Sequence, residues 1–383
     1  MVARAGALED LVTASGPSWR ELEAAYQGRR VLVTGHTGFK GGWLTLWLHS
    51  LGAEVIGVSL PAHTAPSLFE AAGVHRFCQH RELDIRDLAG LRALVGSLRP
   101  EFIFHLAAQS LVRASYEFPI DTISTHVLGT ANILEAARVE KLACGIVVVT
   151  SDKCYENREW HFGYREEDPL GGYDPYSMSK GAAELVTSSY RRSFFPIERM
   201  SEHRTAVASA RAGNVVGGGD WAADRIVPDA IRSLGGGRAI AVRNPFAVRP
   251  WQHVLEPLAG YLLLGTRLAA ERVGTAAASY SEAWNFGPGP EEPVSVGELA
   301  QEIIRAWGEG SWEDRSGGPE PHESPTLHLR IDKAVARLGW RPRWRIRESV
   351  RRTVDWYKAH HAQGAAFDGA GLCMKQIRTY MEA

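Results

Sequence analysis

Short apolar runs alternate along the chain with longer segments whose apolar positions recur every three or four residues. Runs of the first kind favour buried strands, and segments of the second kind favour helices. The predicted strands span residues 30–34, 54–59, 102–107, 145–150 and 205–212, and the main predicted helices span residues 44–51, 121–138 and 176–192. Strands that alternate with helices in this way predict an α/β fold, with a doubly wound parallel sheet of the Rossmann type.

The alternation of strands and helices is regular in only part of the chain, and its changes predict where one structural region ends and the next begins. Residues 1–28 are predicted to be an N-terminal extension, with a short helix at 18–26, and residues 29–212 form the Rossmann domain. Residues 213–360 are predicted to form mainly a smaller C-terminal lobe. The pattern of the tail, 361–383, is uninformative.

Within the C-terminal lobe three features are more specific. Segments near 240–290 are expected to return to the first domain, with the sequence NFG at 285–287 as part of its sheet. Ser295 and Glu298 stand three apart, as in a capping box that opens a helix, here one running to about Trp307. Residues 346–360 are a further predicted helix.

Composition narrows the classes of function. Lys and Arg number 43 and Asp and Glu number 44, which gives a net charge of -1, so no overall positive field attracts nucleic acid or an anionic membrane. No apolar run approaches the length of a membrane span. The four cysteines form no C-x-x-C pair, so we predict neither a metal site nor a disulfide framework, and we expect a cytoplasmic protein.

A glycine-rich loop joins the first predicted strand to the first predicted helix. Glycine in this context lets the backbone approach a pyrophosphate, which then rests on the helix N-terminus, whereas the alternative is an ordinary strand-to-helix turn. The predicted cofactor-binding residues of this loop are Gly35, Thr37, Gly38, Phe39, Lys40 and Gly41. The spacing is G-x-x-G-x-x-G, and a nicotinamide dinucleotide is the expected ligand.

The position that would bind the adenosine ribose lacks its usual acidic residue. The second strand ends at Ser59, with neither a carboxylate nor an arginine there, so this position does not decide between NAD and NADP. Asp84 and Ile85, after a probable third strand, are predicted adenine contacts. Asp87 beside them can equally be a helix cap.

A tyrosine and a lysine stand four residues apart on the helix predicted at 176–192. Tyr176 and Lys180 therefore share a helix face, and the ammonium is expected to lower the pKa of the phenol so that it can take a proton from an alcohol. Ser151, Asp152 and Lys153 follow the strand at 145–150, at the edge of the sheet where open α/β sheets hold ligands. A solvated charged turn is the alternative reading of this triplet.

Together these motifs resemble the extended short-chain dehydrogenase/reductases, and within them the sugar-nucleotide 4,6-dehydratases, most of all the branch that acts on CDP-glucose. The stretches that carry the resemblance are VTGHTGFKGGWL from Val33, HLAAQSLVRASY from His105, VTSDKCYEN from Val149, DPLGGYDPYSMSKGAAELV from Asp168, RAGNVVGGGDWAADRIVPD from Arg211 and RPWQHVLEPLAGYL from Arg249. The family implies NAD as the cofactor. It adds Leu106, Ala107 and Ala108 to the cofactor contacts, together with Tyr176 and Lys180.

The resemblance also implies a reaction with no net oxidation. Tyr176, assisted by Ser151 and Lys180, would remove the 4-hydroxyl proton as hydride leaves C4. Lys153 would take the proton at C5, Asp152 would protonate the departing 6-hydroxyl, and the hydride would return to C6. The expected product is CDP-4-keto-6-deoxyglucose.

For the substrate, the family suggests contacts from Ser110, Asn214, Arg225, Arg249 and His253, with His322 and Glu323 as further candidates. Family members commonly pair through a four-helix contact, here residues 127–138 and 182–192, so a homodimer is expected. Two alternatives stay open: a 4-epimerase or decarboxylase on the same scaffold, for which Asp152 and Lys153 are unnecessary, and a non-catalytic nucleotide sensor.

Overall fold

The computed structural model describes residues 16–276, 278–289, 294–317 and 326–383. Its centre is a seven-stranded, wholly parallel sheet in the order β11-β6-β5-β4-β1-β2-β3. The strands are β1 (Arg30–Thr34), β2 (Glu54–Ser59), β3 (Gln79–Glu82), β4 (Phe102–His105), β5 (Gly145–Val149), β6 (Ala206–Ala212) and β11 (Ala283–Phe286). The order reverses between β1 and β4, and such a switch point opens a crevice at the carboxyl ends of the strands. The predicted doubly wound Rossmann fold is confirmed.

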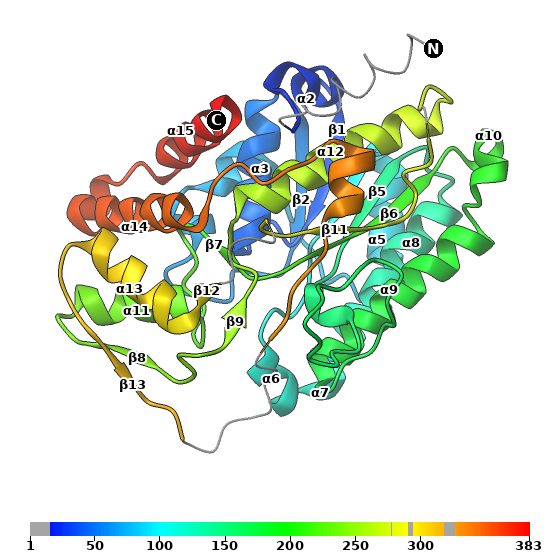
Figure 1. The fold of residues 1–383 in the computed structure, drawn as a ribbon. Helices are drawn as coiled ribbons and strands as arrows, with labels where there is room; N and C mark the ends of the chain where they lie inside the picture. The colour runs from blue at the N-terminus through cyan, green and yellow to red at the C-terminus, as the bar shows by residue number, and fades with distance from the viewer. Residues whose placement is uncertain (1–15, 277, 290–293, 318–325) are drawn as a thin grey trace, which may run out of the picture.

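Helices cover both faces of this sheet (Figure 1). Alternate residues of each strand serve the two faces: Val31 and Val33 pack into one core with α3 and α12, while Leu32 packs into the other with α5 and α8. The helices flanking the sheet are α3 (Phe39–Ser50), α5 (Leu88–Leu98), α8 (Gly129–Val139), α9 (Pro175–Ser193) and α12 (Leu255–Arg272).

The helix expected at 121–138 is three consecutive pieces. They are α7 (Pro119–Ile123), a π-helical turn η2 (Ser124–Leu128) and α8. Of residues 285–287, which were expected to return to the main sheet, Asn285 and Phe286 belong to β11, which pairs with β6 and forms the sheet edge.

The rest of the chain is helical with short strand pairs. Its elements are α11 (Ile226–Gly235), α13 (Val296–Trp307), α14 (Ile346–Gln363) and the small sheets β7–β10 (Val215–Val216, Gln252–His253), β8–β13 (Ile240–Val242, Trp312–Asp314) and β9–β12 (Val248–Arg249, Val294–Ser295). Ser295 and Glu298 form the predicted capping box of α13. One continuous hydrophobic core runs from the central sheet into these helices.

Both ends of the described chain pack against the Rossmann core. Ser18 caps α2 (Trp19–Tyr26), which lies against α12, and Tyr26 donates to the Leu262 carbonyl at 2.6 Å. The tail, where the sequence pattern was uninformative, contains α15 (Gly369–Glu382), which packs on α3 with Tyr380 against Trp47. Among the described residues, no helix is both long enough and apolar enough to cross a membrane.

Candidate active site

The glycine loop between β1 and α3 has the shape that a dinucleotide requires. Gly35 has a φ of +79°, and a Cβ there would stand 2.8 Å from the backbone of Ala107, which follows β4. A Cβ on Gly41 would stand 2.1 Å from the Gly35 carbonyl oxygen. Gly38 is the N-cap of α3, so backbone N–H groups of the first turn are directed at the crevice. The loop therefore leaves room for a pyrophosphate, and the residues present fit a nicotinamide dinucleotide.

The other predicted cofactor-binding residues lie at the ends of the neighbouring strands, and polar contacts hold several of them in place. Thr37 Oγ1 lies 2.7 Å from Ser59 Oγ, at the strand end where an acidic residue was missing. Asp84 is held by Arg86, whose Nε lies 2.9 Å from Asp84 Oδ2, and Ile85 is buried. Leu106, Ala107 and Ala108 follow β4 and are partly buried. The loop residues and those after β4 thus lie at one switch point, whereas Asp84 and Ile85 follow β3 at the sheet edge.

The catalytic candidates meet at the carboxyl end of β5. Ser151 caps a 3-10 turn, η3 (Asp152–Cys154), that packs against α9, on which Tyr176 and Lys180 lie. Asp174 caps α9 by accepting from the Ser177 N–H at 2.9 Å, and Pro175 occupies the first turn, so the helix begins directly before Tyr176. Lys180 Nζ lies 5.9 Å from the centre of the Tyr176 ring. The structure brings all five predicted catalytic residues to one place.

The phenol of Tyr176 has a higher pKa than the sequence predicted. Burial raises the pKa of Tyr176 to about 12, and Asp152 adds to the rise, while a hydrogen bond with Ser151 opposes it. Burial also lowers the pKa of Lys180 to about 8. Burial of the phenol therefore sets the direction of its pKa in this structure, opposite to the fall expected from the spacing of Tyr176 and Lys180.

Asp152 has the properties of a proton donor. Its side chain is buried, and burial raises its pKa against the opposing effects of Lys153, Ser151 and Arg249. Ser151 Oγ donates to Asp152 Oδ1 at 2.9 Å, while Oδ2 has no hydrogen-bond partner in the part of the chain that the structure describes. A raised pKa favours the protonated form of this carboxyl group, which is the form that can protonate a leaving hydroxyl.

Two of the predicted substrate residues, Arg225 and Ser110, contact each other, and Arg225 interacts electrostatically with Tyr176. Arg225 precedes α11 and donates to the Ser110 carbonyl at 3.3 Å and to Asp220 Oδ2 at 2.7 Å. Burial works to lower the Arg225 pKa, and the charges of Asp220 and Tyr176 contribute to raising it instead. Arg225 therefore stays charged near the Tyr176 phenol.

The remaining substrate candidates differ in their surroundings. Arg249 is buried and interacts electrostatically with Asp152, and the Asn214 carbonyl accepts from the Gln252 N–H at 3.1 Å. The ring of His253 instead lies in the core between Trp43 and Trp344, with centroids 6.0 and 4.9 Å away, so its surroundings give no support to a substrate contact. His322 and Glu323 lie outside the described residues.

Lys40 has a position that sequence reasoning missed. Although it belongs to the glycine loop, its Nζ lies 3.4 Å from Tyr261 Oη on α12. Burial, and then the charges of Lys180 and Arg225, lower its pKa to about 7. The Lys40 side chain therefore lies near the charged groups of the catalytic cluster, and only the contact between Lys40 on α3 and Tyr261 on α12 reveals this.

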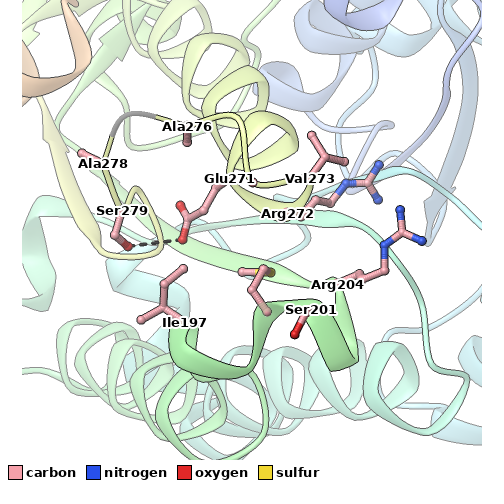
Figure 2. A pocket seen from close by; sticks show the side chains of 11 residues that line it. Ile197, Ser201, Arg204, Glu271, Arg272, Val273, Ala276, Ala278 and Ser279 are labelled. Carbon is pink, nitrogen blue, oxygen red and sulfur yellow. Dashed lines mark hydrogen bonds between the residues drawn. The ribbon is translucent and has the colours of Figure 1, made fainter.

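A cavity of about 570 Å³ lies elsewhere, between α10 (Met200–His203) and the end of α12. Its residues include Ile197, Arg204 and Arg272, while Glu271 is engaged by Ser279 (Figure 2). Since α10 directly precedes β6, this hollow is at the amino end of that strand, opposite the catalytic cluster.

Comparison with known proteins agrees with this geometry. The sequence pattern of the GDP-mannose 4,6 dehydratase family matches residues 32–353. The chain belongs to this family. CDP-glucose 4,6-dehydratase of Salmonella typhimurium is 49% identical to it over 334 residues, which cover 87% of this chain and 92% of that protein.

Solved structures share the family's fold. A dTDP-glucose 4,6-dehydratase of Streptomyces venezuelae, with NAD and TYD bound, matches with a TM-score of 0.73 at 22% identity, over 88% of this chain and 99% of that one. The UDP-glucose 4-epimerase of Thermus thermophilus, in complex with NAD, matches with a TM-score of 0.70 at 25% identity, over 88% and 99%. Dehydratases and epimerases therefore share the scaffold, and residues at the site must separate them.

Proposed function

We propose that this chain is a CDP-glucose 4,6-dehydratase, which converts CDP-glucose to CDP-4-keto-6-deoxyglucose. The observation that carries the proposal is the meeting of Asp152 and Lys153, an acid and a base, with Tyr176 and Lys180 at the carboxyl end of β5. An epimerase needs Tyr176 and Lys180 but has no use for Asp152 and Lys153. The 49% identity to the Salmonella enzyme supports CDP-glucose as the substrate.

Each residue has a proposed step. Tyr176 accepts the 4-hydroxyl proton, while Ser151 orients the phenol and the Lys180 ammonium favours its ionised form. Lys153 then removes the C5 proton, which the neighbouring ketone has made acidic. Asp152 protonates the 6-hydroxyl, which leaves as water. Lys153 finally returns a proton to C5, and Asp152 regains through solvent the proton that Tyr176 releases.

The chemistry that bound NAD would supply is acceptance of the hydride from C4 and its return to C6. Gly35, Thr37, Gly38, Phe39, Lys40 and Gly41 would hold its pyrophosphate, with Leu106, Ala107, Ala108, Tyr176 and Lys180 on the nicotinamide side and Asp84 and Ile85 toward the adenine. Arg225, Arg249, Ser110 and Asn214 would hold the sugar nucleotide, since a guanidinium bonds two phosphate oxygens at once.

Mass spectrometry tests this function directly. Purified protein is incubated separately with CDP-glucose, UDP-glucose, GDP-mannose and dTDP-glucose, first without and then with added NAD. We expect loss of one water from CDP-glucose alone, and no loss with Tyr176→Phe. No mass change with any of the four, or an unchanged mass with a new C4 configuration, would contradict the proposal.

We further propose a homodimer and a reducing compartment such as the cytoplasm. Leu128 and Leu185 are 56% and 60% exposed on η2 and α9, within the segments expected to pair, and an apolar surface of this kind favours association. Cys78, Cys144, Cys154 and Cys373 are all unpaired, which suits a compartment where thiols stay reduced.

A further inference from the structure

Glu184 lies one helical turn beyond Lys180 on α9, and its carboxylate is buried. Three groups donate to it: Thr150 Oγ1 at 2.5 Å, Ser209 Oγ at 2.7 Å and Arg211 Nη2 at 2.9 Å. Thr150 directly follows β5, and Ser209 and Arg211 belong to β6. The carboxylate therefore ties the helix that carries Tyr176 and Lys180 to two strands of the sheet.

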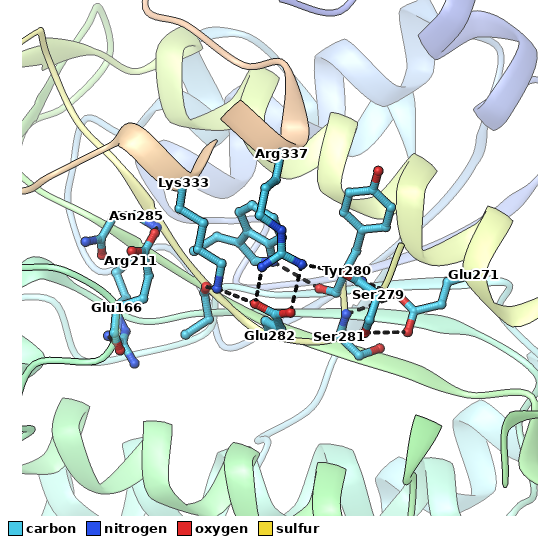
Figure 3. Close-up of polar contacts among 12 residues, drawn as sticks. Glu166, Arg211, Glu271, Ser279, Tyr280, Ser281, Glu282, Asn285, Lys333 and Arg337 are labelled. Atoms are coloured by element: carbon cyan, nitrogen blue, oxygen red, sulfur yellow. Dashed lines mark hydrogen bonds and ion pairs between the residues drawn. The ribbon is translucent and has the colours of Figure 1, made fainter. Parts of the chain in front are cut away.

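Arg211 extends this connection to the other end of the catalytic turn. Its Nη1 donates to Tyr155 Oη at 2.8 Å and to the Glu166 carbonyl at 3.0 Å, and Tyr155 Oη donates to Asn285 Oδ1 on β11 at 2.7 Å. Figure 3 shows Arg211, Glu166 and Asn285 gathered beside β11. Residues 151–153 thus lie between two residues that are fixed by the Glu184–Arg211 ion pair. Thr150, before them, is bonded to Glu184, and Tyr155, after them, is bonded to Arg211.

The groups that surround Lys180 come from several elements. Lys40 approaches from α3, His105 from β4, His126 from η2, Cys154 from η3 and Tyr176 from α9 itself. Burial lowers the pKa of His105 to about 3 and that of His126 to about 2, so both rings are neutral.

The negative charge near Lys180 is provided by Glu184. Burial lowers the Lys180 pKa, and Cys154 and Glu184 oppose this effect. Burial raises the pKa of the Cys154 thiol well above neutral pH, so that group carries no charge at neutral pH. Burial also works to raise the Glu184 pKa, but Arg211, Thr150 and Ser209 outweigh it and the carboxylate stays ionised.

We infer that Glu184 is a positioning residue of the dehydratase: its carboxylate, fixed by Arg211, supplies the counter-charge of Lys180 and sets the catalytic turn against α9. The inference rests on the proposed function for the role of Lys180. Burying two charges brings little net stability, so we assign this pair a role in orientation.

The test is the pH dependence of Glu184→Gln, which keeps the shape of the side chain and removes its charge. Lys180 should then lose its proton at lower pH. We expect the alkaline limb of kcat/KM for CDP-glucose, and the alkaline weakening of NAD binding followed by tryptophan fluorescence, to move down by about one to two pH units. Glu184→Asp should restore both limbs.

Tyr155→Phe is the matched control, because it breaks the contact between Arg211 and Asn285 but leaves the carboxylate in place. It should lower the melting temperature without moving either limb. If Glu184→Gln does not fold, Glu184→Gln/Arg211→Gln removes both charges of the pair and should move both limbs in the same direction by a smaller amount, since loss of the Arg211 charge opposes part of the shift. Limbs that coincide with wild type in the folded variant would overturn the inference.

The two readouts separate this inference from the proposed function. The NAD titration needs no sugar nucleotide, so a shifted limb there, with no dehydration of any substrate, would contradict only the proposed function. Dehydration of CDP-glucose with both limbs unmoved would contradict only the role of Glu184.

Discussion

Gly35 is the residue at which the cofactor loop has least tolerance. It combines a φ of +79° with a neighbouring backbone, that of Ala107, only 2.8 Å from where a Cβ would stand. We expect Gly35→Ala to weaken NAD binding at least about tenfold, because β1 and β4 must move apart at the switch point. Isothermal titration with NAD measures the effect.

Gly28 provides the control for this prediction. Its φ is also positive, +68°, but no atom lies within 4 Å of its Cβ position. Gly28→Ala should cost about 1 kcal/mol of stability through the backbone conformation alone and leave NAD affinity unchanged. Equal affinities for the two variants would show that the close approach to Ala107 is not needed.

Lys153 is predicted to be the base at C5. Lys153→Met should slow incorporation of solvent deuterium at C5 by at least about 100-fold, since general-base catalysis typically contributes that much. Mass spectrometry of CDP-glucose incubated with the enzyme in heavy water measures it. Lys358→Met, which removes an ammonium bonded to the Trp307 carbonyl far along the chain, is the control. Exchange at the wild-type rate in Lys153→Met would assign the base to another residue.

At the level of elements, Glu256 joins α12 to the end of the chain. Its buried carboxyl group accepts from Trp344 N–H at 2.7 Å and from Tyr380 Oη on α15 at 2.6 Å. Arg343 donates to the carbonyls of Tyr380 and Pro17. One carboxyl group and one guanidinium therefore hold both ends of the described chain to the Rossmann core.

This junction has a predicted pH dependence. Burial raises the Glu256 pKa from 4.5 to about 7, against hydrogen bonds from Tyr380, Trp344 and Arg343 that lower it. Between these values the folded chain keeps a proton that the unfolded chain releases, so the contribution to stability is complete below about pH 4.5 and lost as pH rises through about 7.

The melting temperature of Glu256→Gln, measured against wild type from about pH 5 to about pH 8, tests this sign. The difference between variant and wild type should move in favour of the variant as pH rises, because Gln cannot ionise. Gln363→Ala, at an exposed position of α14, removes no ionisable group and should show a constant difference. Parallel curves for Glu256→Gln would contradict the prediction.

At the level of the whole molecule, the exposed leucines of η2 and α9 are predicted to be covered by a second copy. Leu128→Asp together with Leu185→Asp should halve the mass measured by light scattering, because charges would be buried in a two-fold contact. Val273→Asp is the control, since Val273 is also 53% exposed but lies at the end of α12. A monomeric wild type, or a double variant that keeps its dimer mass, would contradict this interface.

The sequence by itself determined the alternation of strands and helices, the glycine loop, and the spacing of Tyr176 and Lys180. These features are local: apolar periodicity, glycine at fixed offsets and residues four apart on one helix face all act within a single element or turn. The family, and the residues proposed as catalytic, followed from the same stretches. The spacing also placed Glu184 in line with Lys180, although the sequence alone gave no reason to notice it.

Only the tertiary structure decided the charges and contacts made between elements. The Lys40 side chain contacts Tyr261, and the ring of His253 lies in the core. The tail forms a helix that packs on α3. The tertiary structure also raised the Tyr176 pKa where spacing suggested the reverse. Burial and the approach of distant segments produce these effects, and neither is encoded in the interval between two residues along the chain.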